Sequence, residues 1–240
     1  MTTPKTLARI AGVLYLLVAA FNIFAGLVNT RIVESGDAAA TADNIGASAT
    51  LFRLGFVGEL VGATVFLLLG LALYLLLNHV NRFAAAAMAV FVAVGAAIQG
   101  LNALNRKAAL TIATGQDHAG AFGPAGSDQL TMLFADLHHD GYLIAQMYFG
   151  LWLLPLGYLI VKSGYFPKAL GVLMVIGCSG HLVDMFARFL APGIAANISP
   201  FAMTPPAVAE ISLIVWLLVK AVRVPVPDVR AASVAHSGSG

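Results

Sequence analysis

The sequence predicts an all-α, polytopic membrane protein with six transmembrane helices in one bundle. Of its 240 residues, 60% are hydrophobic and only 10% are charged, whereas soluble domains carry about 25% charged residues. Apolar segments close to the roughly 20 residues that a helix needs to cross the hydrocarbon recur along the whole chain. Runs such as LVGATVFLLLGLALYLLL do not alternate as the strands of a membrane barrel do, so we expect helices.

Six apolar segments bounded by polar or turn-forming residues give the predicted spans. The first follows the basic start MTTPKTLAR and exceeds the roughly 7–15 apolar residues of a signal peptide, so we expect it to remain uncleaved. The short links NHVNR and KSGYFPK separate the second span from the third and the fourth from the fifth. The predicted transmembrane domain covers residues 1–223, with spans at about 7–28, 51–77, 83–104, 129–161, 168–190 and 205–223.

Local signals predict two helix starts and a tail. A Gly-rich loop, TGQDHAGAFGPAGS, precedes the fourth span, and Ser127 or Asp128 at its end is a candidate N-cap. Thr204 followed by Pro205 and Pro206 predicts the start of the sixth span. We expect residues 224–240 to be a disordered cytoplasmic tail.

The distribution of basic residues predicts the orientation. Six spans place both termini on one side of the membrane, and Lys and Arg in short loops mark the cytoplasmic side. Eight of the 13 basic residues lie on the side of the termini, whereas ten of the 11 acidic residues do not. We therefore expect both termini in the cytoplasm and a multi-pass protein of the bacterial inner membrane. The eight basic residues are Lys5, Arg9, Arg82, Lys162, Lys168, Lys220, Arg223 and Arg230.

Composition also limits the partners. A net charge of +2 with scattered Lys and Arg argues against nucleic acid. The one cysteine, Cys178, lies in an apolar segment, which excludes an intramolecular disulfide and a multi-cysteine zinc site, and we expect it to be a buried apolar side chain. Membrane lipids are the expected surroundings, no cofactor is predicted, and a homodimer stays open.

Each predicted span carries a stripe of polar residues, often beside glycine. Ionisable groups within membranes are costly and normally face the bundle interior. At about 100° per residue, Asp136, His139 and Asp140 share one face of the fourth span with Gln146, and we expect this face to point inward. His138 falls on the opposite face, so we expect it to lie outside the polar interior.

The stripes together predict a polar pocket. From the helical rise we expect the fourth span to form its mouth at the outer interface, the fifth span its wall and Glu210 its floor near mid-depth. We expect ion pairs between Arg188 and Asp184, and between Glu59 and either Arg53 or Arg106. The GxxxG spacing of Gly58 and Gly62 predicts a close helix contact. The predicted pocket residues are Asn22, Glu59, Gln99, Asn102, Arg106, Asp136, His139, Asp140, His181, Asp184, Arg188 and Glu210.

Four segments of the chain carry a resemblance that runs from about Leu7 to Arg223: LARIAGVLYLL, ATLFRLGFVGEL, DLHHDGYLIAQMYFGLWLLPLGYLIVKSGYFPKALGVLMVIG and AEISLIVWLLVKAVR. They resemble a bacterial family of integral membrane proteins catalogued as a domain of unknown function, DUF4386. The resemblance implies a compact helical membrane domain and no assigned reaction. It also leads us to expect an aromatic residue such as Tyr where this chain has His181. The residues that fit the family pattern are Asp136, His138, Gly141, Asp184 and Glu210.

The residues leave several functions open. The polar side chains could only hold the helices together, or they could bind a small polar or amphiphilic ligand or take part in transport, although no inverted repeat is apparent. An intramembrane enzyme acting on a lipid or isoprenoid head group could use Asp136, His139 and Asp140 as an acid–base group, with Glu210 as a buried acid. The sequence lacks a nucleophile elbow, HExxH and a phosphate-binding loop, which favours a non-enzymatic role.

Two further roles stay open. A metal site would need about three ligands, for which Asp136, His139 or Asp140 and His181 are candidates. No HxxxH spacing supports such a site, and we assign no metal. A scaffold for a partner protein is the last alternative.

Overall fold

The computed structural model describes residues 3–115 and 122–223. Within these residues the chain forms eight helices and no strand. Six segments are long and apolar enough to cross a membrane, α5 and α6 together forming one of them. The predicted all-α fold with six spans is confirmed. The helices are α1 (Pro4–Ile32), α2 (Ala38–Ala47), α3 (Ala49–Leu77), α4 (Arg82–Ala113), α5 (Gly123–Leu151), α6 (Leu153–Ser163), α7 (Lys168–Leu190) and α8 (Pro192–Val219).

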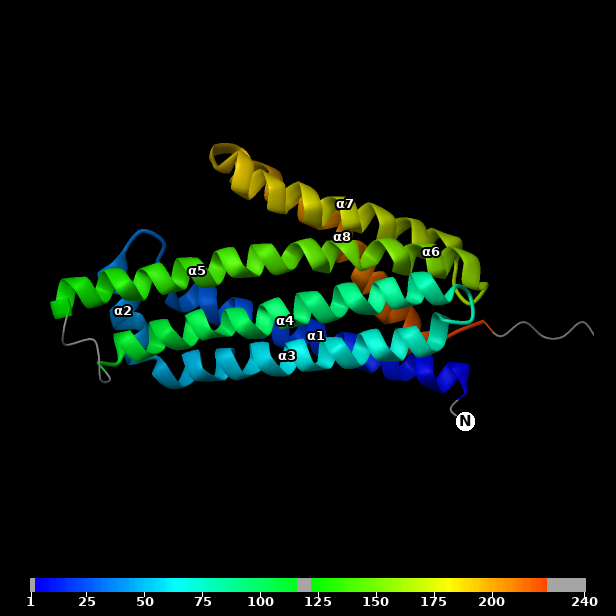
Figure 1. The fold of residues 1–240 in the computed structure, drawn as a ribbon, viewed down its shortest axis with the longest axis horizontal. Helices are drawn as coiled ribbons and strands as arrows, with labels where there is room; N and C mark the ends of the chain where they lie inside the picture. Colours follow the sequence, from blue (N-terminus) through cyan, green and yellow to red (C-terminus); the bar gives the residue numbers. More distant parts are fainter. Residues whose placement is uncertain (1–2, 116–121, 224–240) are drawn as a thin grey trace, which may run out of the picture.

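The long helices lie along one bundle axis (Figure 1). α1 begins and α8 ends at the same end of the bundle, where the α3–α4 and α6–α7 links also lie; we call this the terminal end. The opposite, distal end carries α2, the end of α4 and the start of α5. α7 diverges from α5 toward the distal end, so that its neighbours change along its length (Figure 1).

The buried apolar core is concentrated toward the terminal end. α6 supplies Leu156 and Leu159, which are fully buried against residues such as Leu73 of α3 and Leu213 of α8. A smaller cluster at the distal end includes Ile45 of α2 and Phe52 of α3. Large apolar side chains also cover the outside of the bundle, as expected where the surroundings are lipid.

The predicted start of the sixth span is wrong. α8 begins at Pro192, and Pro200, Pro205 and Pro206 lie inside it. Thr204 does not cap the helix, because its hydroxyl donates to the carbonyl of Pro200 one turn back, at 2.7 Å. Prolines are tolerated within membrane helices when neighbouring helices compensate for the lost backbone bonds.

A glycine of α7 lies where the helix bonding of α8 is interrupted. Pro206 has no N–H to donate to the carbonyl of Ala202. Gly180 packs directly against this carbonyl and against the ring of Pro206, with no room for a Cβ atom. The close approach joins α7 and α8 over the proline-containing segment.

The fourth span also differs from its predicted limits. α5 begins at Gly123, with Phe122 at the N-cap position, so Ser127 and Asp128 lie inside the helix and are not its N-cap. The span breaks between α5 and α6 because Pro155 cannot donate to the carbonyl of Leu151. The predicted tail at 224–240 and residues 116–121 of the Gly-rich loop lie outside the described residues.

The GxxxG pair of α3 does form a close helix contact. A Cβ atom at Gly58 would lie 3.3 Å from the ring of Phe24, and one at Gly62 would lie 3.2 Å from Cβ of Phe21. Both aromatic residues belong to α1. This contact brings the polar stripes of α1 and α3 onto the same side of the bundle.

Candidate functional site

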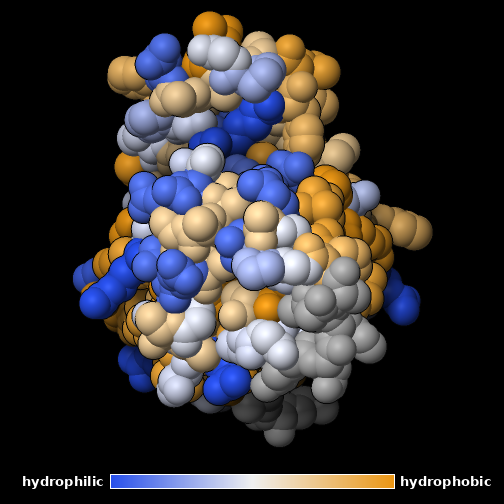
Figure 2. All heavy atoms as spheres, turned by 90° about the vertical axis from the view of Figure 1, so that its left-hand side faces the viewer, coloured by the Kyte–Doolittle hydropathy of each residue, from blue (hydrophilic) through white to orange (hydrophobic). Residues whose placement is uncertain are grey.

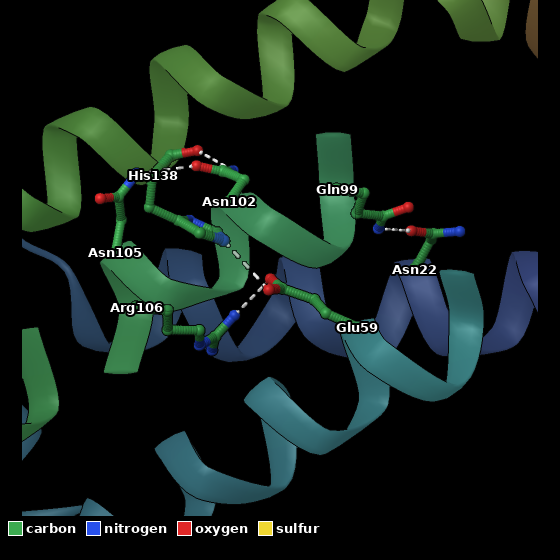
Figure 3. A network of polar contacts seen from close by, with 7 residues as sticks. All are labelled: Asn22, Glu59, Gln99, Asn102, Asn105, Arg106 and His138. Carbon is green, nitrogen blue, oxygen red and sulfur yellow. Dashed lines mark hydrogen bonds and ion pairs between the residues drawn. The ribbon is translucent and has the colours of Figure 1, made fainter. Parts of the chain in front are cut away.

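A buried ion-pair network joins α3, α4 and α5 toward the distal end (Figure 3). Arg106 of α4 donates from Nη1 to Oε1 of Glu59 on α3 at 2.7 Å. Nε2 of His138 on α5 lies 3.0 Å from the other carboxylate oxygen, Oε2. The side chain of Arg106 is only 1% exposed, so its charge depends on Glu59 for compensation.

Amide side chains complete this Glu59 network. Asn102 donates to the carbonyl of His138 at 2.7 Å and accepts from Asn105 at 3.0 Å. Gly141 lies against the amide of Asn102 without space for a Cβ atom, which allows α4 and α5 to approach closely. The guanidinium of Arg106 also stacks over the ring of Phe52, 4.5 Å from its centroid.

The predicted inward face of α5 is wrong at this end. His138 is buried in the Glu59 network, whereas Asp136, His139 and Asp140 are exposed. The spacing of about 100° per residue correctly places His138 on the face opposite to the other three residues. The error lies in expecting one face of the helix to point inward along its whole length. α7 covers the face that carries Gln146, then diverges toward the distal end and leaves the same face uncovered further out (Figure 1). There α5 packs against α4 and α2, and His138 faces α4 and the Glu59 side chain of α3.

A second cluster ties α5, α7 and α8 together around Asp184. The carboxylate accepts from Gln146 at 2.9 Å and from Nε of Arg188 at 3.2 Å. Its other oxygen accepts from the hydroxyl of Ser199 on α8. Asp184 is only 2% exposed, so its carboxylate is removed from water, and these donors replace the lost hydration. The predicted pairing of Asp184 with Arg188 is confirmed, and Glu59 pairs with Arg106 and not with the exposed Arg53.

A third carboxylate, Glu210 of α8, meets side chains from α1 and α7. The hydroxyl of Tyr15 donates to Oε2 of Glu210 at 2.7 Å, and Nε2 of His181 lies 3.2 Å from Oε1. The buried Nδ1 of His181 has no hydrogen-bond partner among the described residues. Glu210 stands nine residues before the end of α8, about 14 Å along the helix. With the end of α8 placed at the boundary of a hydrocarbon layer about 30 Å thick, Glu210 would lie near its middle.

Glu210, Tyr15 and His181 line a cavity of about 260 Å³, which we call the inner pocket. Five aromatic rings that contact one another in sequence form part of its lining: Tyr15, Trp152, Phe66, Phe149 and Tyr142. Their neighbouring centroids are 5.6, 5.3, 5.6 and 6.1 Å apart.

The inner pocket opens sideways between α1 and α8. Ile23 of α1 and Ile211 of α8 both line it, and they are 63% and 61% exposed on the apolar side of the bundle. In a bilayer this side faces the acyl chains. The pocket thus combines a polar group at mid-depth with an apolar exit toward lipid.

A second cavity of about 250 Å³, the distal pocket, lies beside the first. Most of its lining residues carry a polar group, among them Asn29 and Thr30 near the end of α1 and His139 of α5. Asn22, Gln99 and Tyr142 line both pockets. The remaining lining residues are Ala25, Gly26, Glu59 and His138.

The residues predicted to form one pocket are therefore divided. Four of them lie outside the two pocket linings and take part in buried hydrogen-bond or ion-pair clusters: Asn102, Arg106, Asp184 and Arg188. Asp136 and Asp140 lie exposed at the distal end. The residues that line a pocket are Asn22, Glu59, Gln99, His139, His181 and Glu210.

Sequence reasoning omitted Tyr15, His138, Ser199 and the aromatic rings from the predicted pocket. Tyr15 lies on the same face of its helix as Asn22 and Gly26, so the helical spacing alone could have placed it in the predicted pocket. Within the described residues, no group of three His, Cys, Asp or Glu side chains could hold a metal ion. Cys178 is buried with a free thiol.

Comparison with known proteins identifies the family but not an activity. An uncharacterized protein of Archaeoglobus fulgidus is 35% identical over 77 residues, which make up 32% of this chain and 44% of the relative. The aligned part thus spans less than half of that relative's length. No solved structure matches the chain. Residues 10–221 match the family described as Domain of unknown function (DUF4386). The chain, a multi-pass helical membrane protein, belongs to this family.

Proposed function

We propose that the protein binds a small amphiphile with an amine head group, taken up sideways from the bilayer into the inner pocket. The observation that carries this proposal is the position of Glu210, a carboxylate near mid-membrane that lines a pocket open toward lipid. Ionisable groups at this depth are costly and commonly mark functional sites. The head group would meet Glu210, and the apolar tail would leave between Ile23 and Ile211.

The chemistry of the lining favours a cationic, hydrogen-bond-donating head. When Glu210 is ionised it can only accept hydrogen bonds, and Nε2 of His181 then donates to it. This tautomer leaves Nδ1 of His181 as a second acceptor. The aromatic faces around the pocket add cation–π attraction for an ammonium group.

The same lining argues against a phosphate-bearing head group. Arg and Lys are the usual phosphate-binding residues, and the described residues that line the inner pocket include neither. A lipid phosphate or isoprenoid phosphate would therefore be buried beside Glu210 without a positive partner. Binding of an amine is the better match, and it needs no bond-breaking step.

We further propose that the terminal end faces the cytoplasm of a bacterial cell and that the membrane is the inner membrane. The terminal end carries Lys5 and Arg9 in the first two turns of α1, Arg82 and Lys168 at the starts of α4 and α7, and Lys162 in the last turn of α6. Such a concentration of basic residues marks the cytoplasmic side. The distal pocket would then open to the outside, and fractionation of the two membranes of a Gram-negative host tests the location.

Native mass spectrometry of the protein, extracted directly from its own membrane into nanodiscs, tests the binding proposal. We expect the wild type to retain an amphiphile that carries an amine. In A19F the new ring would fill the inner pocket, which Ala19 lines, so the bound species should be lost. A20F is the matched control, because Ala20 is the next residue, is exposed and lines neither pocket. An identical bound species in all three proteins, or a retained phospholipid, would contradict the proposal.

A further inference from the structure

We propose that the distal pocket is the aqueous entrance to the inner pocket, so that water and protons reach Glu210 from the distal end of the bundle. The inner pocket would then have two openings, one toward lipid and one toward water. This inference deepens the proposed function, because it concerns access to the same carboxylate.

The two pockets meet at a boundary of side chains. Asn22 of α1, Gln99 of α4 and Tyr142 of α5 line both cavities. Nε2 of Gln99 donates to Oδ1 of Asn22 at 3.0 Å, which closes the boundary with one amide pair (Figure 3). The amide of Asn22 is also bonded to the carbonyl of Val18, at 2.9 Å, and is held in place. A rotation of the Gln99 side chain would therefore open the boundary while Asn22 stays fixed.

The distal pocket is suited to hold water. A cavity of about 250 Å³ is far larger than one water requires, and buried waters need polar partners. Amide, hydroxyl and imidazole groups provide these partners on α1, α4 and α5. Thr30 and His139, which line the pocket, are exposed and lie near the distal end. Figure 2 looks onto this end and shows hydrophilic residues gathered across it.

The charges along the pathway favour protons and small cations. The lining of both pockets, within the described residues, includes neither Arg nor Lys. Glu59 lines the distal pocket but is engaged by Arg106 and His138, so its charge is already compensated. Among the described residues, Glu210 is met in its hydrogen-bonding shell by Tyr15 and His181. It is therefore the carboxylate on the route that has no Arg or Lys partner within the described residues.

The pathway is long enough to explain how a mid-membrane group contacts water. Tyr15, which bonds Glu210, and Thr30, near the distal end, are 15 residues apart on α1. This separation corresponds to about 22 Å along the helix.

Cysteine labelling tests the pathway directly. The chain has one cysteine, so C178S provides a background for single cysteines. We expect a positively charged methanethiosulfonate, which reacts with thiolates in water, to label A19C in the inner pocket at least about tenfold faster than A20C on the lipid side. The two positions differ by about 1.5 Å in depth, so depth alone cannot explain such a difference. T30C, at the mouth of the distal pocket, is the control for full access.

A second variant tests whether water enters through the boundary. Q99F, which places a ring between the pockets, should slow labelling of A19C but leave T30C unchanged, and the unchanged T30C rate reports intact folding. Equal, slow labelling of A19C and A20C would overturn the pathway, as would labelling of A19C that Q99F does not affect.

Labelling needs no bound amine, so amine binding with an unlabelled A19C would reject only the pathway. Labelling without amine binding would reject only the proposed function. With reagent added outside intact cells, labelling of T30C also tests the proposed orientation.

Discussion

Replacing Glu210 with Gln is expected to weaken the binding of dodecylamine about 100-fold. The substitution keeps the shape of the side chain, and its amide oxygen can still accept from Tyr15, so the bundle should fold normally. It removes the negative charge opposite the ammonium head. A charge-assisted hydrogen bond in a buried site contributes about 1.5–3 kcal/mol, and a 100-fold loss corresponds to about 2.7 kcal/mol.

The fluorescence of Trp152 can report this binding. The chain has two tryptophans, and only Trp152 lines the inner pocket. The W216F variant in nanodiscs therefore places a single reporter next to the ligand. D140N is the matched control, because it removes one negative charge from an exposed position at the distal end. Equal affinities for E210Q and D140N would show that Glu210 does not hold the amine.

Replacing Glu59 with Ala is expected to lower the free energy of unfolding by about 3–5 kcal/mol. The reason is that Arg106, almost fully buried, would keep its charge without a counter-ion. His138 would lose the same carboxylate, which it approaches at 3.0 Å. Denaturant-induced unfolding in detergent micelles would measure the change, with D136A as a control at an exposed acidic position.

A double replacement separates charge compensation from packing. E59M with R106M removes both charges and fills much of the same volume, so it should recover most of the stability lost in E59A. Replacing buried ion pairs with apolar residues of similar size is often neutral or stabilising. A stability of E59A close to that of D136A would contradict the assigned role of the Glu59 network. So would a double variant less stable than E59A.

The spans could be predicted from sequence because hydrocarbon length and backbone hydrogen bonding leave few alternatives. Their limits were harder to predict, as Pro205 and Pro206 show. In a soluble helix two adjacent prolines mark a start or an end. Here α7 packs Gly180 closely against the interrupted turn of α8. A contact of this kind depends on a neighbouring helix that the local sequence does not reveal.

The candidate site was partly predictable for a similar reason. The cost of burying charge predicted that Asp184 would pair with Arg188 and that Glu59 would need a basic partner. The face of α5 was misjudged at His138, because the direction of the interior changes where α7 diverges (Figure 1). The aromatic lining was not foreseen, since rings such as Phe66 give the same sequence signal whether they face a pocket, the core or lipid.

The proposed binding of a cationic amphiphile in the inner pocket is tested most directly with three ligands that differ only in their head groups. Dodecylamine, dodecanol and dodecanoate would each be titrated into nanodiscs that contain the W216F protein, with Trp152 emission as the signal. We expect a saturable change with dodecylamine, a weaker one with dodecanol, and none with dodecanoate, because the inner pocket offers Glu210 without Arg or Lys among its described lining residues. Equal responses to all three, or the strongest response to dodecanoate, would contradict a site for cationic amphiphiles.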